Sequence, residues 1–377
     1  MRIGKVVVVS IAALAGLTVA MSIWRYGTGT RRPSNDIPLT PFESAFSYVG
    51  ETQLQGALAK TINDVIVAPT GDVYLADNDA KQVARYAPDG RLLNTIGRPG
   101  FLPGQFAVPF SLATDTTGER LYVLDVKQAR VQVFKPTGEL LSSVAFGPLG
   151  LIGLALHVDS NGTIYIGGRR RFARAGENAY MVHRLTPLGQ NVSSFYPLDA
   201  RIDKLNLRGL AGVMMAPGPQ QTIYAAQPIR SRVAQFDPDG HLVREIGREA
   251  PFYREAQKLP DLGLNNYTLE KVEPYLNKWT QLSRLIALSN GEVMITYRVH
   301  RPELATASEV FSPNGELVVG EIGSRYFPVS AGPNGVVFWR DVKAKGVTLY
   351  QYRLLSAAKV ANVAPAHRDP LMRANNQ

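Results

Sequence analysis

Histidine is the first side chain to consider, because it serves both as a general base and as the commonest metal ligand in proteins. The chain has five: His157, His183, His241, His300 and His367. A catalytic zinc needs three protein ligands that converge on one point, and only His157 falls on a strand that the repeat pattern below places near the centre of the fold. Because cysteine is absent, thiolate metal sites, cysteine nucleophiles and disulfides are excluded. We therefore predict no metal site and no cofactor, and weigh a structural role for His157 against a role in binding.

The acidic residues do not form a catalytic set either. Asp77 and Asp125 occupy matching places after two predicted strands, which favours carboxylates that accept turn N–H groups. Asp64 opens an inner strand and is predicted to face a central tunnel, where it would bind a cation, a ligand amine or only solvent. No Gly-x-Ser-x-Gly elbow, phosphate loop or paired-carboxylate spacing occurs. Asp64 and His157 are thus the candidate tunnel residues.

The densest charge cluster is basic. Arg169, Arg170, Arg171 and Arg174 lie within six residues, in a predicted loop (residues 167–176) of a chain whose net charge is +10. The planar guanidinium group suits phosphate and carboxylate partners. The cluster predicts binding to an anionic partner, such as phospholipid headgroups, an acidic cell-wall polymer or an acidic protein, with a solvated loop as the alternative.

One nine-residue window, residues 130–138 (RVQVFKPTG), organises the chain. Alternating apolar residues predict a strand, the proline presets φ for a turn, and the closing glycine tolerates a positive φ. The window recurs, with Pro and Gly in the same columns, at residues 82–90, 181–189, 232–240 and 307–315. The closing glycines are 48, 51, 51 and 75 residues apart, and a period near 50 predicts a repeat architecture. With the strands before and after each window, every unit holds four antiparallel strands and forms a propeller blade.

These units resemble the NHL repeat, and so does the run between the first two units, residues 104–109 (GQFAVP). The resemblance covers about residues 45–355 and implies an all-β, six-bladed β-propeller, a fold that hosts binding modules and several enzymes. Five units are complete: residues 61–97, 110–146, 154–196, 210–247 and 285–323. The sixth, residues 325–354, lacks a fourth strand, whereas residues 45–50 form a glycine-ending strand with no blade before it. We predict that this strand completes the sixth blade and closes the ring.

The ends of the chain differ from the repeats. Residues 1–26 predict a signal-anchor helix, since Arg2 and Lys5 precede an uncharged run (residues 6–24) of nearly bilayer-spanning length. Cleavage of a signal peptide, followed by secretion, is the alternative. We expect a single-pass protein of the cell inner membrane with its propeller on the periplasmic side, joined by a polar tether, residues 27–44. Residues 356–377 lack any pattern and predict a disordered tail.

An insertion, residues 248–283, breaks the rhythm between the fourth and fifth units. It predicts a helix from about Thr268, with an apolar stripe at helical spacing: Leu269, Val272, Leu276, Trp279 and Leu282. Such a stripe favours packing on the ring. Alternatively, Tyr275 and Trp279 belong with Tyr267 to an aromatic lid over one tunnel mouth and to a recognition face.

Together these features predict a membrane-tethered binding or scaffold module for a protein or anionic ligand, rather than an enzyme. The alternative is a propeller enzyme of the lyase or lactonase type with its site in the tunnel. The amidating lyases of the resembled family hold zinc with histidines near the ring axis, a set that this chain lacks. Some NHL propellers bind RNA through a basic face, but the predicted membrane segment argues against nucleic acid here.

Overall fold

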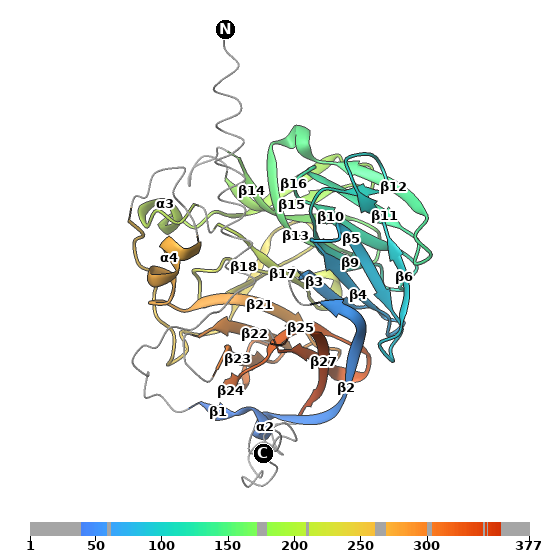
Figure 1. Cartoon of the computed structure of the whole chain (residues 1–377). Helices are drawn as coiled ribbons and strands as arrows, with labels where there is room; N and C mark the ends of the chain where they lie inside the picture. The colour runs from blue at the N-terminus through green and yellow to red at the C-terminus, as the bar shows by residue number, and fades with distance from the viewer. Residues whose placement is uncertain are drawn as a thin grey trace.

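The computed structural model describes residues 39–58, 62–171, 179–208, 211–260, 269–299, 304–341, 344 and 346–355. They form a closed ring of six twisted antiparallel sheets (Figure 1). The innermost strands contact one another around the ring in the order β3, β9, β13, β17, β21, β25 and back to β3. The prediction of a six-bladed β-propeller is therefore confirmed.

Each blade contains four antiparallel strands, and in blades one to five their order in the chain is their order from the inner to the outer edge of the ring. Blade one holds β3 Ile62–Val67, β4 Val73–Asp77, β5 Gln82–Tyr86 and β6 Leu92–Ile96. Blade two holds β9 Pro109–Thr114, β10 Leu121–Asp125, β11 Arg130–Phe134 and β12 Leu140–Ala145. Blade three holds β13 Leu151–Val158, β14 Ile164–Arg170, β15 Tyr180–Leu185 and β16 Asn191–Pro197. Blade four holds β17 Met214–Pro217, β18 Ile223–Ala226, β19 Val233–Phe236 and β20 Leu242–Ile246. Blade five holds β21 Gln281–Ala287, β22 Val293–Arg298, β23 Thr306–Phe311 and β24 Leu317–Ser324.

The N-terminal strand closes the ring, as predicted. Blade six consists of β25 Phe327–Ala331, β26 Val336–Arg340, β27 Gly346–Leu354 and, on the outside, β2 Phe46–Leu58. The strand β2 pairs antiparallel with β27, from Phe46 opposite Leu354 to Leu58 opposite Gly346, and is longer than the predicted residues 45–50. Before it, α2 (Phe42–Ala45) follows β1 (Thr40–Pro41), which adds a parallel fifth strand to blade five beside β24.

The closing strand is held by an aromatic cluster. The Phe46 side chain is 2% exposed, and its ring lies 5.3 Å from that of Trp339 and 4.9 Å from that of Phe42. The same strand reaches blade one, because the Gln55 N–H donates to the Gly90 carbonyl at 3.0 Å. Gly90 has φ +87°, and a Cβ there would lie 2.1 Å from the Gln53 carbonyl oxygen. Glycine is therefore needed at position 90 for two reasons: the turn requires a positive φ, and the close contact between β2 and blade one leaves no room for a Cβ.

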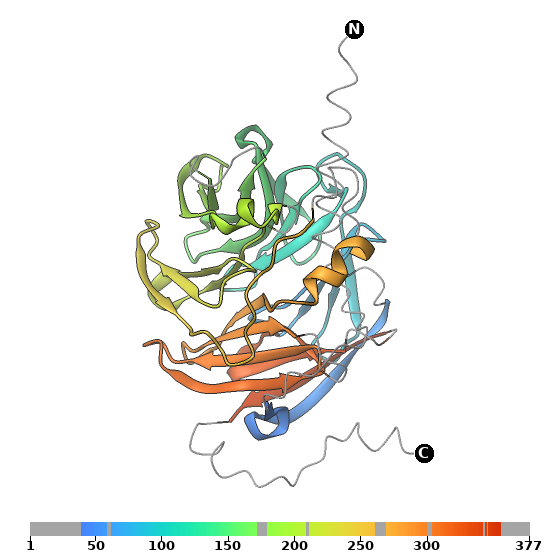
Figure 2. The same cartoon turned by 90° about the vertical axis from the view of Figure 1, so that its left-hand side faces the viewer.

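The loops fall on two faces, since neighbouring strands in each blade run antiparallel. The turns from first to second and from third to fourth strands share one face, which we call the turn face. The links between blades and the loops from second to third strands share the other, which we call the connector face. The short helices α3 (Arg201–Lys204) and α4 (Leu269–Leu276) belong to blade links and lie next to each other at the edge of the ring (Figures 1 and 2).

Two local predictions need correction. The strand β14 extends to Arg170, so Arg169 and Arg170 end a strand and are not part of a loop, because the inner strand β13 is long enough to pair with both. The insertion helix ends at Leu276, and Leu282 belongs to β21, where it packs on a different apolar cluster from Val272 and Leu276. The predicted stripe therefore spans a helix, a turn and the start of a strand.

The predicted signal-anchor (residues 1–26), the tether before Leu39 and the tail (residues 356–377) lie outside the described residues. Within the described ranges, no helix has the length and apolar character needed to cross a membrane.

The closing strand yields a stability prediction. We expect Phe46→Ala to lower the free energy of unfolding by about 3–5 kcal/mol, because it removes a buried ring from the aromatic cluster. Val49→Ala, on the same strand but 46% exposed, should cost less than about 1 kcal/mol. Urea denaturation of the two variants measures both values, and equal losses would show that β2 does not belong to the core.

Candidate functional site

A cavity of ≈ 560 Å³ lies on the ring axis. Residues of all six inner strands line it. The lining continues to Pro217, the last residue of β17, and to Pro69 and Pro333, just beyond the ends of β3 and β25. The cavity therefore reaches the turn face. Its walls are mostly apolar, with Ile66, Leu156 and Met215 among them, and its polar side chains include both predicted tunnel residues, Asp64 and His157.

Asp64 is held by a network that crosses the ring. One carboxylate oxygen, Oδ2, accepts from the Leu112 N–H of blade two at 3.0 Å, and Oδ1 lies 3.2 Å from a guanidinium nitrogen of Arg284 in blade five. Arg284 also donates to the Val329 carbonyl of blade six. The Asp64 side chain is only 9% exposed and the Arg284 side chain 21% exposed. The prediction placed Asp64 on the axis but did not identify Arg284, whose partner is 220 residues away in the chain.

His157 is the second axial candidate, and its surroundings differ from those of Asp64. Its half-buried imidazole lies 5.8 Å, between ring centroids, from Tyr165 on the neighbouring strand. Among the described residues, neither ring nitrogen makes a hydrogen bond. Burial lowers the pKa of His157 to about 4, against a smaller opposing effect of Asp159. The cavity therefore contains a neutral imidazole with unused hydrogen-bonding capacity.

The arginine cluster is divided by its surroundings. The Arg169 guanidinium is partly buried and donates to the Arg170 and Arg171 carbonyls at 3.3 and 3.0 Å. Burial lowers its pKa, and so does the nearby charge of Arg208. Arg170 and Arg171 are exposed on the connector face, whereas Arg174 lies outside the described residues. Two of the four predicted arginines are therefore exposed, and Arg169 hydrogen-bonds the backbone that follows it. Binding of an anionic partner by this cluster stays a prediction.

The insertion aromatics lie away from the axis. The Trp279 side chain is 1% exposed in the core between blades three and four, and Tyr275 packs against the same cluster with Lys278 over its ring. Neither residue lines the axial cavity. Trp279 thus follows the packing alternative and is not at the surface for recognition, while a binding role for Tyr275 stays a prediction.

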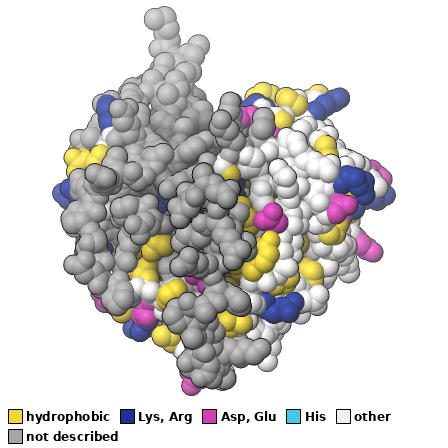
Figure 3. All heavy atoms as spheres, turned by 60° about the horizontal axis from the view of Figure 1, so that its bottom comes forward, with side chains coloured by type: hydrophobic (Ala, Val, Ile, Leu, Met, Phe, Trp, Pro, Cys, Tyr) yellow, Lys and Arg dark blue, Asp and Glu magenta, His cyan; other side chains and the backbone are white. Residues whose placement is uncertain are grey.

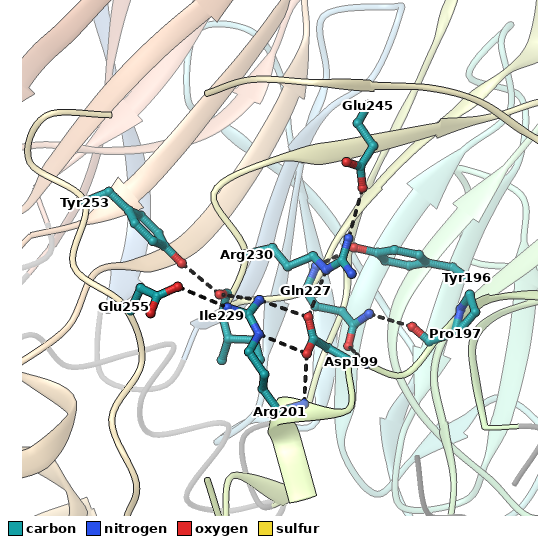
Figure 4. A network of polar contacts seen from close by, with 10 residues as sticks. All are labelled: Tyr196, Pro197, Asp199, Arg201, Gln227, Ile229, Arg230, Glu245, Tyr253 and Glu255. Carbon is teal, nitrogen blue, oxygen red and sulfur yellow. Dashed lines mark hydrogen bonds and ion pairs between the residues drawn. The ribbon is translucent and has the colours of Figure 1, made fainter. Parts of the chain in front are cut away.

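A polar network that the sequence did not indicate links blades three and four to the insertion (Figure 4). The Asp199 carboxylate, 7% exposed, accepts from Arg201 and Arg230 at 3.0 Å each. Burial alone would raise the pKa of Asp199, but these guanidinium groups and the Arg201 N–H hold it at about 2. The Tyr253 hydroxyl of the insertion donates to Ile229 in the same network. Because every charge has a partner, the network fixes the insertion and presents no open site.

No group of three or more potential metal ligands occurs among the described residues. Asp77 accepts from the turn N–H groups of Asp79 and Ala80, as predicted. Asp125 accepts from the turn N–H of Gln128 and also from the N–H groups of Ala107 and Val108 in the link between blades one and two.

No protein-family model matches the chain. A curated human protein, NHL repeat-containing protein 3 of Homo sapiens, is 34% identical over 84 residues, which are 21% of this chain and 24% of that protein. The match thus spans about a quarter of the length of that relative. Two bacterial structures share the fold: a member of the DUF4221 family from Bacteroides vulgatus (TM-score 0.58, 9% identity, 82% of this chain and 98% of that chain) and a protein from Bacteroides fragilis described as exported (TM-score 0.57, 9% identity, 85% and 100%). The chain is a six-bladed β-propeller with NHL-like repeats.

The imidazole yields a pH prediction. The pKa of His157 is lowered from 6.5 to about 4 in the folded chain. As pH falls, the unfolded chain therefore takes up a proton at this residue at a higher pH than the folded chain does. The free energy of unfolding consequently decreases as pH falls from 6.5 to 4. We expect His157→Gln to lose less stability than the native chain over that range. His241→Gln, at a side chain that is 80% exposed, is the control. Urea denaturation at pH 7, 5.5 and 4.5 tests this, and parallel curves for native chain and His157→Gln would contradict it.

Proposed function

We propose that this protein is a membrane-tethered, extracytoplasmic β-propeller that binds a ligand or the tip of a partner in its axial cavity. The observation that carries the proposal is the neutral imidazole of His157, which has no hydrogen-bond partner among the described residues and lies in a cavity with mostly apolar walls. A concave, largely apolar site with few polar groups is what small-molecule recognition generally uses. The rigid ring keeps the site preformed, which reduces the entropic cost of binding.

The tethered location follows from the predicted signal-anchor, residues 1–26. The described fold is compatible with it, because β1 and β2 place the N-terminal end of the propeller at its periphery (Figure 1). The Bacteroides fragilis protein of the same fold, described as exported, supports a location outside the cytoplasm. The exposed Arg170 and Arg171 support an anionic contact on the connector face.

A cavity-filling change tests the binding site. Ala113 is half-buried and lines the cavity, so Ala113→Phe should lower the amount of bound ligand by about tenfold or more through steric exclusion. Ala145→Phe, at an exposed alanine of the outer strand β12, is the matched control. Tagged full-length chain is incubated with a solubilised membrane extract, and captured proteins and small molecules are quantified by mass spectrometry. Equal capture by both variants, at unchanged melting temperature, would reject the cavity as the site.

The free imidazole also favours a second candidate, an enzyme whose site is the same cavity, because a neutral histidine can act as a general base. The same captured material distinguishes the two. A binding module returns its ligand unchanged, whereas an enzyme converts it, and His157→Gln would stop that conversion.

The exposed arginines yield a separate prediction. Changing Arg170 and Arg171 to Ser should lower the salt concentration that elutes the full-length chain from immobilised polyglutamate, since exposed charges act over about 8–10 Å at physiological ionic strength. The melting temperature should stay the same. The control is a second double variant, in which Arg91 and Arg120 are changed to Ser. These two arginines are exposed on the turn face, and their loss lowers the net charge by the same amount. Identical elution of the two double variants would reduce Arg170 and Arg171 to solvated side chains.

A further inference from the structure

A short loop on the connector face presents two large apolar side chains to solvent. The strands β7 (Arg98–Pro99) and β8 (Gln105–Phe106) pair in parallel at the two ends of this loop, in the link between blades one and two. Between them, Phe101 is 65% exposed and Leu102 is 66% exposed. Adjacent exposed apolar residues also occur on outer strands, at Leu92–Leu93 and Leu242–Val243, but they are only 36–57% exposed. On the side of the molecule that Figure 3 shows, other apolar side chains form small groups beside charged ones. Two adjacent, largely exposed apolar residues at a loop tip indicate an interaction surface.

Buried polar side chains of blade two hold this loop in place. Arg130 is 8% exposed and donates to the Leu102 and Gln105 carbonyls at 2.8 and 2.7 Å. Gln132 is fully buried, accepts from the Gly104 N–H at 2.7 Å and donates to the Gln105 carbonyl at 2.8 Å. These hydrogen bonds fix the backbone of the tip before it binds anything. Binding through Phe101 and Leu102 would therefore cost little conformational entropy.

The surroundings of the tip are basic. The Lys127 ammonium lies 5.6 Å from the centroid of the Phe101 ring, and Arg98 is exposed at the start of the loop. Residues 97–108 contain no acidic side chain. Aromatic and aliphatic side chains flanked by Lys and Arg suit the interface of an anionic bilayer, where the rings enter the headgroup layer and the cations meet phosphate.

The position of the loop is compatible with such a surface. It shares the connector face with the exposed Arg170 and Arg171. The first described residue, Leu39, lies beside Gly323, near the connector-face end of β24. Residues 25–38 can span up to about 50 Å when extended, so a propeller tethered by the predicted anchor can lay this face on the membrane.

We propose that the Phe101–Leu102 tip inserts into the interface of an anionic membrane and orients the connector face toward it, leaving the cavity end on the turn face open to solution. The inference rests on the tethering that is part of the proposed function and is independent of what the cavity binds.

The test uses the absence of cysteine from the chain. Leu102→Cys carries a single environment-sensitive fluorophore, and the labelled full-length chain is reconstituted in vesicles of phosphatidylethanolamine and phosphatidylglycerol. Brominated acyl chains should quench this probe, and aqueous iodide should not. The matched control is Leu188→Cys, since Leu188 is 86% exposed in a turn of blade three on the opposite face. Adding Phe101→Ser to the first variant should shift the insertion equilibrium of the tip toward water by about tenfold.

The outcomes separate the two proposals. Lipid quenching at position 102 but not at position 188 supports insertion of the tip. Iodide quenching at both positions, in chain that sediments with the vesicles, overturns insertion while the tether stands. Lipid quenching at both positions shows unspecific adsorption and also overturns it. Chain that stays in the supernatant would contradict the tether and the insertion together, whereas the capture experiment on Ala113→Phe still decides the cavity.

Discussion

The pairing of β2 with β27 is the interaction on which the rest of the structure depends. A propeller is an open row of sheets until its first and last blades join, and this chain joins them by placing an N-terminal strand on the outside of the C-terminal blade. Through Gln53 and Gln55 the same strand also contacts the turn of blade one at Gly90. A single strand therefore spans the seam, and the axial cavity exists because the six inner strands are held at a fixed distance from the axis.

The repeated window does more than shape each blade. Its proline carbonyl is an acceptor for the preceding blade: Arg85 donates to the Pro136 carbonyl at 3.2 Å, and Arg244 donates to that of Pro313. In blades two and five, the turn that Pro and Gly create thus presents a carbonyl to the preceding blade. Local turn chemistry and the packing of blade on blade favour the same arrangement, which is the consistency expected of a sequence that specifies one fold.

This consistency explains what the sequence allowed us to predict. Blade number, order and closure follow from columns that repeat, and a position on an inner strand placed Asp64 and His157 on the axis. Contacts between non-repeated segments were beyond prediction. Arg284 reaches Asp64 from an inner strand whose register shifts between Leu282 and that residue, and no local pattern marks such a shift. The burial of Trp279 likewise depends on where the insertion folds back, which helical periodicity alone does not determine.

The two axial candidates also show how a cavity is to be interpreted. An axial space is a geometric consequence of six blades, so its existence says little about function. Its unsatisfied polar groups say more. The charge of Asp64 is neutralised by Arg284, and its oxygens already accept hydrogen bonds. Asp64 therefore stabilises the ring and has little remaining capacity to bind a ligand. His157 is neutral near pH 7 and lacks a hydrogen-bond partner among the described residues. A ligand of this cavity should therefore be held by apolar contact and neutral hydrogen bonds, whereas the anionic surface that we propose as a partner would meet arginine and lysine on the connector face. The two faces of the ring are thus suited to different partners, and the rigid ring can keep both engaged at once.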